Sequence, residues 1–96
     1  MNRENVIILL HANMEELRHL GIRSISLFGS VARGKSVAGS DIDLLVDLEP
    51  PHTFDRYTQA LFFIEDLLGC PIDLVMQETL KPRARPSVEQ EAIHVT

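Results

Sequence analysis

The sequence has one cysteine, Cys70, and no long apolar run. A lone cysteine excludes a disulfide within the chain and fits a protein of the reducing cytoplasm. The longest unbroken apolar run near the start, Val6 to Leu10, is too short for a membrane span or a typical signal sequence. We therefore expect a cytoplasmic protein without membrane contact.

Basic residues are also scarce. The chain has 9 Lys and Arg against 14 Asp and Glu, for a net charge of −5. Broad nucleic-acid binding needs basic surface that displaces counterions, so direct nucleic-acid binding is not expected. A length of 96 residues predicts one small domain over 1–96, without room for a second domain that grips a substrate.

The hydrophobic pattern predicts an alternation of helices and strands. Apolar residues recur at helical spacing over 4–20 and over the segment between Thr53 and Gly69, and two glycines, Gly21 and Gly69, are placed to end these helices. The buried sides are expected to carry Val6, Leu10, Met14, Leu17 and Leu20 in the first helix, and Phe54, Tyr57, Leu61, Ile64 and Leu68 in the second. Strands are expected at 22–28, 41–48 and 71–76, and residues 87–96 are expected to form one helical turn and a short extended end. This order predicts an α/β or α+β fold with helices over a small sheet.

Two carboxylates, Asp41 and Asp43, begin the second predicted strand. Residues two apart on a strand point to the same face, about 6.5–7 Å apart along the backbone. Without a cation, the two carboxylates repel each other. Mg²⁺ could supply the positive charge, because it prefers carboxylate oxygens and substrate phosphates as ligands. Asp73 is a charge inside the otherwise apolar third strand, and if that strand lies beside the second it could act as a metal ligand and general base. The alternative is that Asp41 caps a turn while Asp43 and Asp73 line an exposed sheet face.

The loop ahead of this strand has two interpretations. Residues 29–36 read GSVARGKS, a literal match to the P-loop pattern G-x-x-x-x-G-K-S. A P-loop runs directly into a helix, whereas four residues separate Ser36 from the next predicted strand. In the second interpretation Gly29 and Ser30 approach a triphosphate closely and Arg33 neutralises its charge. Lys35 could do the same or simply be solvated.

Together these residues resemble a known signature. Gly29-Ser30, ten intervening residues and Asp41-Ile42-Asp43 are similar to the G-S-x10-D-x-D motif of the polymerase-beta-like nucleotidyltransferase superfamily. The strings LFGSVARG and SDIDLLVDLE resemble its minimal nucleotidyltransferase group, the antitoxin partners of HEPN toxins. The likeness extends to PIDLVM, to LKPR and to the terminal EAIHV. Pro86 departs from the more helical tail that the group usually has.

The resemblance implies both a fold and an activity. The fold would be a small mixed sheet of three to four strands with helices on one face. Asp41, Asp43 and Asp73 would be catalytic and would bind Mg²⁺, as two ions, while Gly29, Ser30 and Arg33 would bind the nucleotide. The chain would transfer AMP from ATP to a tyrosine of a HEPN toxin and silence it, with 81–96 as a connector and partner-contact segment. Two alternatives remain: an idle antitoxin that acts by binding alone, and a small-molecule nucleotidyltransferase of the antibiotic-modifying kind.

Overall fold

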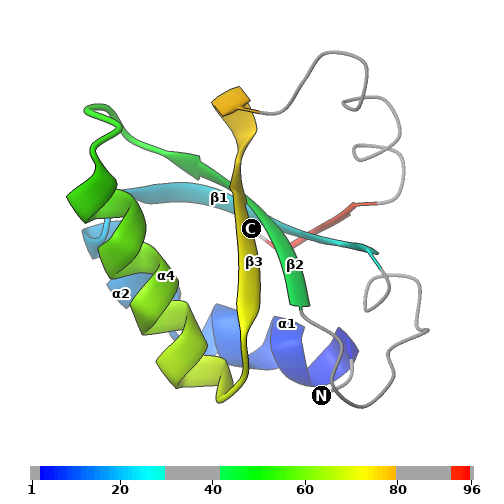
Figure 1. The fold of residues 1–96 in the computed structure, drawn as a ribbon. Coiled ribbons are helices and arrows are strands. Elements are labelled where there is room, and N and C mark those ends of the chain that lie inside the picture. The colour runs from blue at the N-terminus through cyan, green and yellow to red at the C-terminus, as the bar shows by residue number, and fades with distance from the viewer. Residues whose placement is uncertain (1–2, 30–41, 80–91, 96) are drawn as a thin grey trace.

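The sheet has four strands and mixed pairing in a computed structural model that describes residues 3–29, 42–79 and 92–95. The spatial order is β3-β2-β1-β4, with β1 antiparallel to β2 and β4, and β2 parallel to β3 (Figure 1). The strands are β1 (Ile22–Phe28), β2 (Ile42–Leu48), β3 (Ile72–Met76) and β4 (Ile93–His94). The predicted small mixed sheet is confirmed, and β4 is the predicted extended end.

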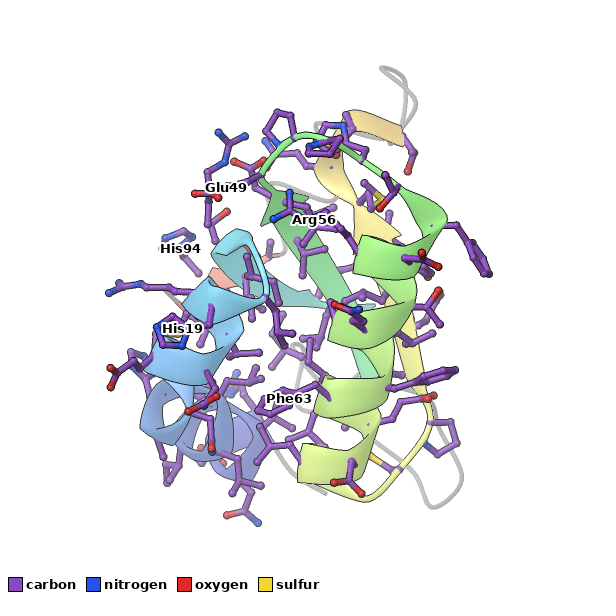
Figure 2. The ribbon with its side chains drawn as sticks, turned by 90° about the vertical axis from the view of Figure 1, so that its left-hand side faces the viewer. His19, Glu49, Arg56, Phe63 and His94 are labelled. Atoms are coloured by element: carbon purple, nitrogen blue, oxygen red, sulfur yellow. The ribbon has the colours of Figure 1, made fainter. Side chains whose placement is uncertain are left out.

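The helices cover one face of this sheet, and the core lies between them (Figures 1 and 2). They are α1 (Arg3–Ala12), α2 (Met14–His19) and α4 (Phe54–Leu68), and a 3-10 turn, η1 (Gln77–Thr79), follows β3. The sheet side of the core consists mainly of alternate strand residues: Ile25, Leu27, Ile42, Leu44, Val46, Leu48, Ile72 and Leu74. The opposite face, which we call the open face, therefore carries the intervening residues of each strand.

The first predicted helix is wrong in one respect, because it is interrupted at Asn13. The Asn13 side-chain amide donates to the Leu9 carbonyl at 3.0 Å, and its backbone carbonyl accepts from the Leu17 amide at 3.0 Å. Asparagine side chains compete with the helix for backbone partners in this way. Val6, Leu10 and Leu17 are buried as predicted, and Met14 and Leu20 are half-buried. Two short helices thus replace one long helix while keeping most of its buried stripe.

Helix α4 has the predicted ends. The Thr53 hydroxyl accepts from the Arg56 amide at 3.2 Å, as expected of an N-cap, and Gly69 ends the helix in the left-handed conformation at φ 70°. The predicted buried side is partly wrong: Ile64 and Leu68 are buried, but Phe54 is 79% exposed. Phe54 is the first residue of the helix, so no preceding helical turn continues the apolar stripe beyond it. Apolar spacing alone therefore overestimates its burial.

Strand β1 has the predicted bounds but not the predicted faces throughout. Strict alternation would place Ile22 on the face of Ser24 and Ser26, yet Ile22 is buried together with Ile25 and Leu27. The register with β2 shifts between Ile22 and Ser24, which is the signature of a bulge. The irregularity turns Ile22 back into the core and leaves the two serines on the open face.

Arg56 connects α4 to the turn that leaves β2. Its guanidinium donates to the carbonyls of Glu49 and Pro50 at 2.9 and 3.0 Å (Figure 2). The Glu49 amide in turn donates to the Gly21 carbonyl at 2.7 Å. Gly21 has φ +91°, and an added Cβ there would lie 3.0 Å from the Arg56 guanidinium. These contacts fix the far end of β2 and so its orientation across the sheet.

The architecture bears on two questions, whether the chain has a P-loop fold and whether any described helix could cross a membrane. The antiparallel pairing of β1 with β2 is incompatible with a P-loop fold, in which a strand, the loop and a helix belong to a parallel sheet. Within the described ranges, no helix has the length and apolar character that crossing a membrane requires.

Candidate active site

Asp43 lies on the open face, near the beginning of β2. It is paired with Phe28 of β1 and is half-buried, whereas its neighbours Ile42 and Leu44 belong to the core. The alternation along β2 therefore separates the two sides: apolar residues hold the strand against the helices, and the carboxylate is left on the other side. This placement is the one that the sequence predicts.

Gly29, the first residue after β1, lies directly against the Asp43 carboxylate. Its φ is +78°, in the region that side chains rarely adopt. A Cβ added at Gly29 would lie 2.9 Å from the Asp43 Cγ, closer than real contacts allow. The sequence motif predicts that this glycine approaches a triphosphate, but its contact with Asp43 is a second reason for a glycine here. The residue before Ser30 must lack a side chain because Asp43 occupies that space.

Asp73 is brought to Asp43 by the parallel pairing of β2 and β3. The two residues are direct partners in the register, which runs from Ile42 with Ile72 to Val46 with Met76. Residues opposite one another on neighbouring strands lie about 4.8 Å apart at their Cα atoms and point to the same face. Asp73 is exposed. Strand β3 therefore lies beside β2, which is the arrangement that a shared site for Asp43 and Asp73 requires. The two carboxylates face the same solvent-accessible space.

Three of the predicted site residues, Ser30, Arg33 and Asp41, lie outside the described residues. Their assignments to nucleotide and metal stay predictions. Among residues 3–29, 42–79 and 92–95, no three His, Cys, Asp or Glu side chains gather closely enough to hold a metal ion. Asp41, the third carboxylate that the sequence motif predicts beside Asp43 and Asp73, lies outside these residues.

A groove of about 440 Å³ extends over the open face beyond Asp43. Leu45, two residues after Asp43 on the same strand face, forms part of its floor, and the Ser26 hydroxyl and the His94 Nδ1 are 3.4 Å apart on its β1–β4 side. Asp47 also lines the groove and forms an ion pair with Arg23 at 3.0 Å. The position of His94 could not be predicted from the sequence, because the four histidines have no ligand spacing and the β1–β4 pairing places His94 here.

Tyr57 of α4 lies behind β3, close to Asp73. Its hydroxyl donates to the Leu74 carbonyl at 2.7 Å. Burial, and then the negative charges of Asp73 and Glu65, raise the pKa of the Tyr57 hydroxyl above its ordinary value. The periodicity of the helix predicts a buried Tyr57, but no feature of the sequence indicates which backbone group its hydroxyl would meet.

Comparison with known families identifies the class of protein. The family model "nucleotidyltransferase domain" matches residues 13–95, so this chain belongs to the nucleotidyltransferase domain family. It is 37% identical over 93 residues to the protein adenylyltransferase MntA of Thermococcus cleftensis, and this covers 96% of the chain and 94% of that protein.

Solved structures agree with this assignment. One described as a minimal nucleotidyltransferase superposes with a TM-score of 0.85 at 35% identity, covering 97% of this chain and 95% of that one. A toxin–antitoxin structure with AMP-PNP matches at TM-score 0.70 and 24% identity over 98% of this chain and 73% of that one. A tri-AMPylated HEPN toxin of Shewanella oneidensis in complex with its MNT antitoxin matches at 0.67 and 18%, over 94% and 71%. The last two matches establish the shared fold.

Proposed function

We propose that this chain is a Mg²⁺-dependent protein adenylyltransferase, an antitoxin that transfers AMP from ATP to a tyrosine of a HEPN toxin and so neutralises it. The observation that carries the proposal is the in-register pair Asp43 and Asp73, with Gly29 against the first carboxylate. The named relative of 37% identity is a protein adenylyltransferase, and the toxin–antitoxin structures of the same fold contain AMP-PNP or an AMPylated toxin.

The reaction is a displacement at the α-phosphorus of ATP. The acceptor oxygen forms a bond to that phosphorus, the bond to the bridging oxygen breaks, and pyrophosphate leaves. Asp73 is the proposed base that takes the phenolic proton, because it is exposed and lies beside Asp43. Ser30, Arg33 and Gly29 are the proposed contacts to the triphosphate.

The donors available suit Mg²⁺. Asp43 and Asp73 offer hard oxygen ligands on one face, the kind that Mg²⁺ prefers. Together with Asp41 they would hold the ion or ions, which would offset the charge of the triphosphate and of the leaving pyrophosphate. The chain itself supplies the fixed spacing of the carboxylates, which comes from the β2–β3 register.

The acceptor must come from another molecule. The chain has one tyrosine, Tyr57, and its hydroxyl is engaged with the Leu74 carbonyl behind the sheet. The groove lies on the same face of the sheet as Asp43, and Leu45, two residues along the strand from Asp43, lines it. An idle antitoxin would not need this arrangement of Gly29, Asp43 and Asp73, so transfer is favoured over simple docking.

The test is to incubate the protein, Mg²⁺ and a HEPN toxin with ATP labelled at the α or the γ phosphate. Label on the toxin from the α position alone supports adenylyl transfer. Label from γ alone would identify a kinase, and a stable complex without label would identify an antitoxin that only docks. The mass of the recovered toxin gives the number of AMP groups added.

A further inference from the structure

Side chains of α4 and η1 bind the edge of β3 that faces away from β2. The Ile72 amide donates to the Glu65 carboxylate at 3.4 Å, and the Tyr57 hydroxyl donates to the Leu74 carbonyl at 2.7 Å. In a parallel strand, alternate residues direct their backbone groups to the same side. Ile72 and Leu74 are therefore the outward-facing residues on either side of Asp73, and α4 holds both of them.

Strand β3 is held elsewhere by its pairing with β2 and by the core residues Ile72 and Leu74. It has five residues, β2 is its one neighbouring strand among the described residues, and Pro71 before it has no amide to donate. In a longer sheet a second neighbouring strand would bind the outward edge. Here two polar side chains of α4, Tyr57 and Glu65, bind that edge at the residues on either side of Asp73.

The position of Asp73 matters because its partner in the register is Asp43. A slip by one residue would turn Asp73 to the core face, and a smaller shift would change the spacing of the two carboxylates. The charge of Asp73 also contributes to the raised pKa of Tyr57, in agreement with their proximity.

We propose that Tyr57 and Glu65 are positioning residues that hold Asp73 opposite Asp43, and so set the geometry of the carboxylates without touching substrate. The catalytic part of this inference rests on the proposed function. The positioning part does not, because it concerns β3 in the protein alone.

The test compares Tyr57→Phe with a matched control on the same strand edge. The Thr79 hydroxyl donates to the Met76 carbonyl at 2.8 Å, which is the same kind of bond three residues from Asp73. Thr79→Val removes that bond. A small misplacement of a reacting group can cost up to about a hundredfold in rate. We expect Tyr57→Phe to lower kcat by roughly tenfold to a hundredfold with unchanged KM for ATP, whereas Thr79→Val leaves both unchanged.

Two further measurements use the protein without nucleotide or toxin. Binding of Mn²⁺ followed by electron paramagnetic resonance should weaken in Tyr57→Phe and not in Thr79→Val. Hydrogen exchange at the Asp73 amide, which faces β2, should accelerate in Tyr57→Phe alone. All comparisons are made well below the unfolding temperature of each variant, so that a general loss of stability does not change the Mn²⁺ binding or the exchange rate.

Glu65 offers a conservative rescue. Glu65→Gln keeps an oxygen that can accept from the Ile72 amide, whereas Glu65→Leu has none. We expect the glutamine variant to keep the slow Asp73 exchange and the Mn²⁺ affinity of the unaltered protein, and the leucine variant to lose both. This pair also decides the matter if Tyr57→Phe does not fold.

The outcomes separate the two proposals. If the unaltered protein transfers no AMP, the proposed function fails, and exchange at the Asp73 amide still decides whether Tyr57 and Glu65 position β3. If transfer occurs but Tyr57→Phe matches Thr79→Val in kcat, Mn²⁺ binding and Asp73 exchange, the positioning proposal is overturned.

Discussion

Asp43 and Asp73 are direct partners across the parallel β2–β3 pair, so two negative charges stand side by side on the open face. Like charges directly opposite one another destabilise a sheet. The core residues beneath them, Leu44 and Leu74, hold the strands in this register in spite of the repulsion. The arrangement therefore costs some stability, as expected of a pair of carboxylates that the proposed function assigns to a cation, and this has a measurable consequence.

Without divalent cations, Asp73→Asn should make the protein more stable by a few tenths of a kcal/mol, because it removes the repulsion with Asp43. Thermal unfolding in EDTA measures this. Adding Mg²⁺ should raise the unfolding temperature of the unaltered protein more than that of the variant.

Asp47→Asn is the matched control. Asp47 is on the same face of β2 but forms an ion pair with Arg23, so its loss should leave the stability in EDTA unchanged or slightly lower. A less stable Asp73→Asn in EDTA would contradict the argument.

Removal of the Asp43 carboxylate should abolish AMP transfer without unfolding the domain. Asp43→Asn keeps the size of the side chain beside Gly29 and removes its charge. Asp47→Asn removes a carboxylate four residues further along the same strand face and should retain most of the activity. The measurement is transfer of α-labelled phosphate to the toxin, with circular dichroism to confirm folding. Equal activity in the two variants would remove Asp43 from the active site.

Much of the sheet could be predicted from the sequence, because alternation is a local property. The bounds of β1 are those predicted, β2 is a strand over the described part of its predicted range, Ile42–Leu48, and β3 begins one residue later than predicted. The interruption of the helix over 4–20 was less predictable, since the apolar spacing continues past Asn13 while its side chain binds the Leu9 carbonyl. Phe54, at the start of α4, is a second case in which apolar spacing predicts burial and the side chain is exposed.

The placement of Asp43 and Asp73 on one face of the sheet could be predicted from the sequence, but the contacts around them could not. Asp43 and Asp73 are 30 positions apart, and their register depends on how β3 packs between β2 and α4. The contact of Gly29 with Asp43 and the bond from Tyr57 to Leu74 are likewise non-local. The roles of Ser30, Arg33 and Asp41 remain predictions from the motif.

Substitution of Gly29 should damage the site beyond its effect on stability. Gly29→Ala places a methyl group against the Asp43 carboxylate and forces a residue with a side chain to keep φ at +78°. The backbone strain alone costs about 1–2 kcal/mol. We expect that loss in urea denaturation, and in addition a loss of AMP transfer, because Asp43 must move.

Gly69→Ala is the control for strain alone. Gly69 has φ +70°, and an added Cβ there meets no atom within 4 Å. It should cost a similar 1–2 kcal/mol, in rough terms, and leave transfer unchanged when both variants are assayed in the folded state. If Gly29→Ala retained full activity, the contact with Asp43 would have no functional importance.

Tyr57 should titrate above the ordinary range of a tyrosine. Burial raises the pKa of its hydroxyl first, and the charges of Asp73 and Glu65 raise it further. The chain has one tyrosine and no tryptophan, so the near-ultraviolet absorption of tyrosinate reports Tyr57 alone. Asp73→Asn should lower this pKa, and Glu65→Gln should lower it by less. An unchanged pKa in Asp73→Asn would mean that the two side chains are not close.

The same raised pKa predicts a loss of stability at alkaline pH. The folded protein holds the Tyr57 proton more tightly than the unfolded chain does, so this contribution is fully present below the pKa of the unfolded chain. It is lost as the pH rises through the folded pKa, because ionised Tyr57 can no longer donate to the Leu74 carbonyl. Urea denaturation at increasing alkaline pH should therefore show a steeper fall for the unaltered protein than for Tyr57→Phe, which has no proton to lose. Parallel curves would show that another group causes the alkaline unfolding.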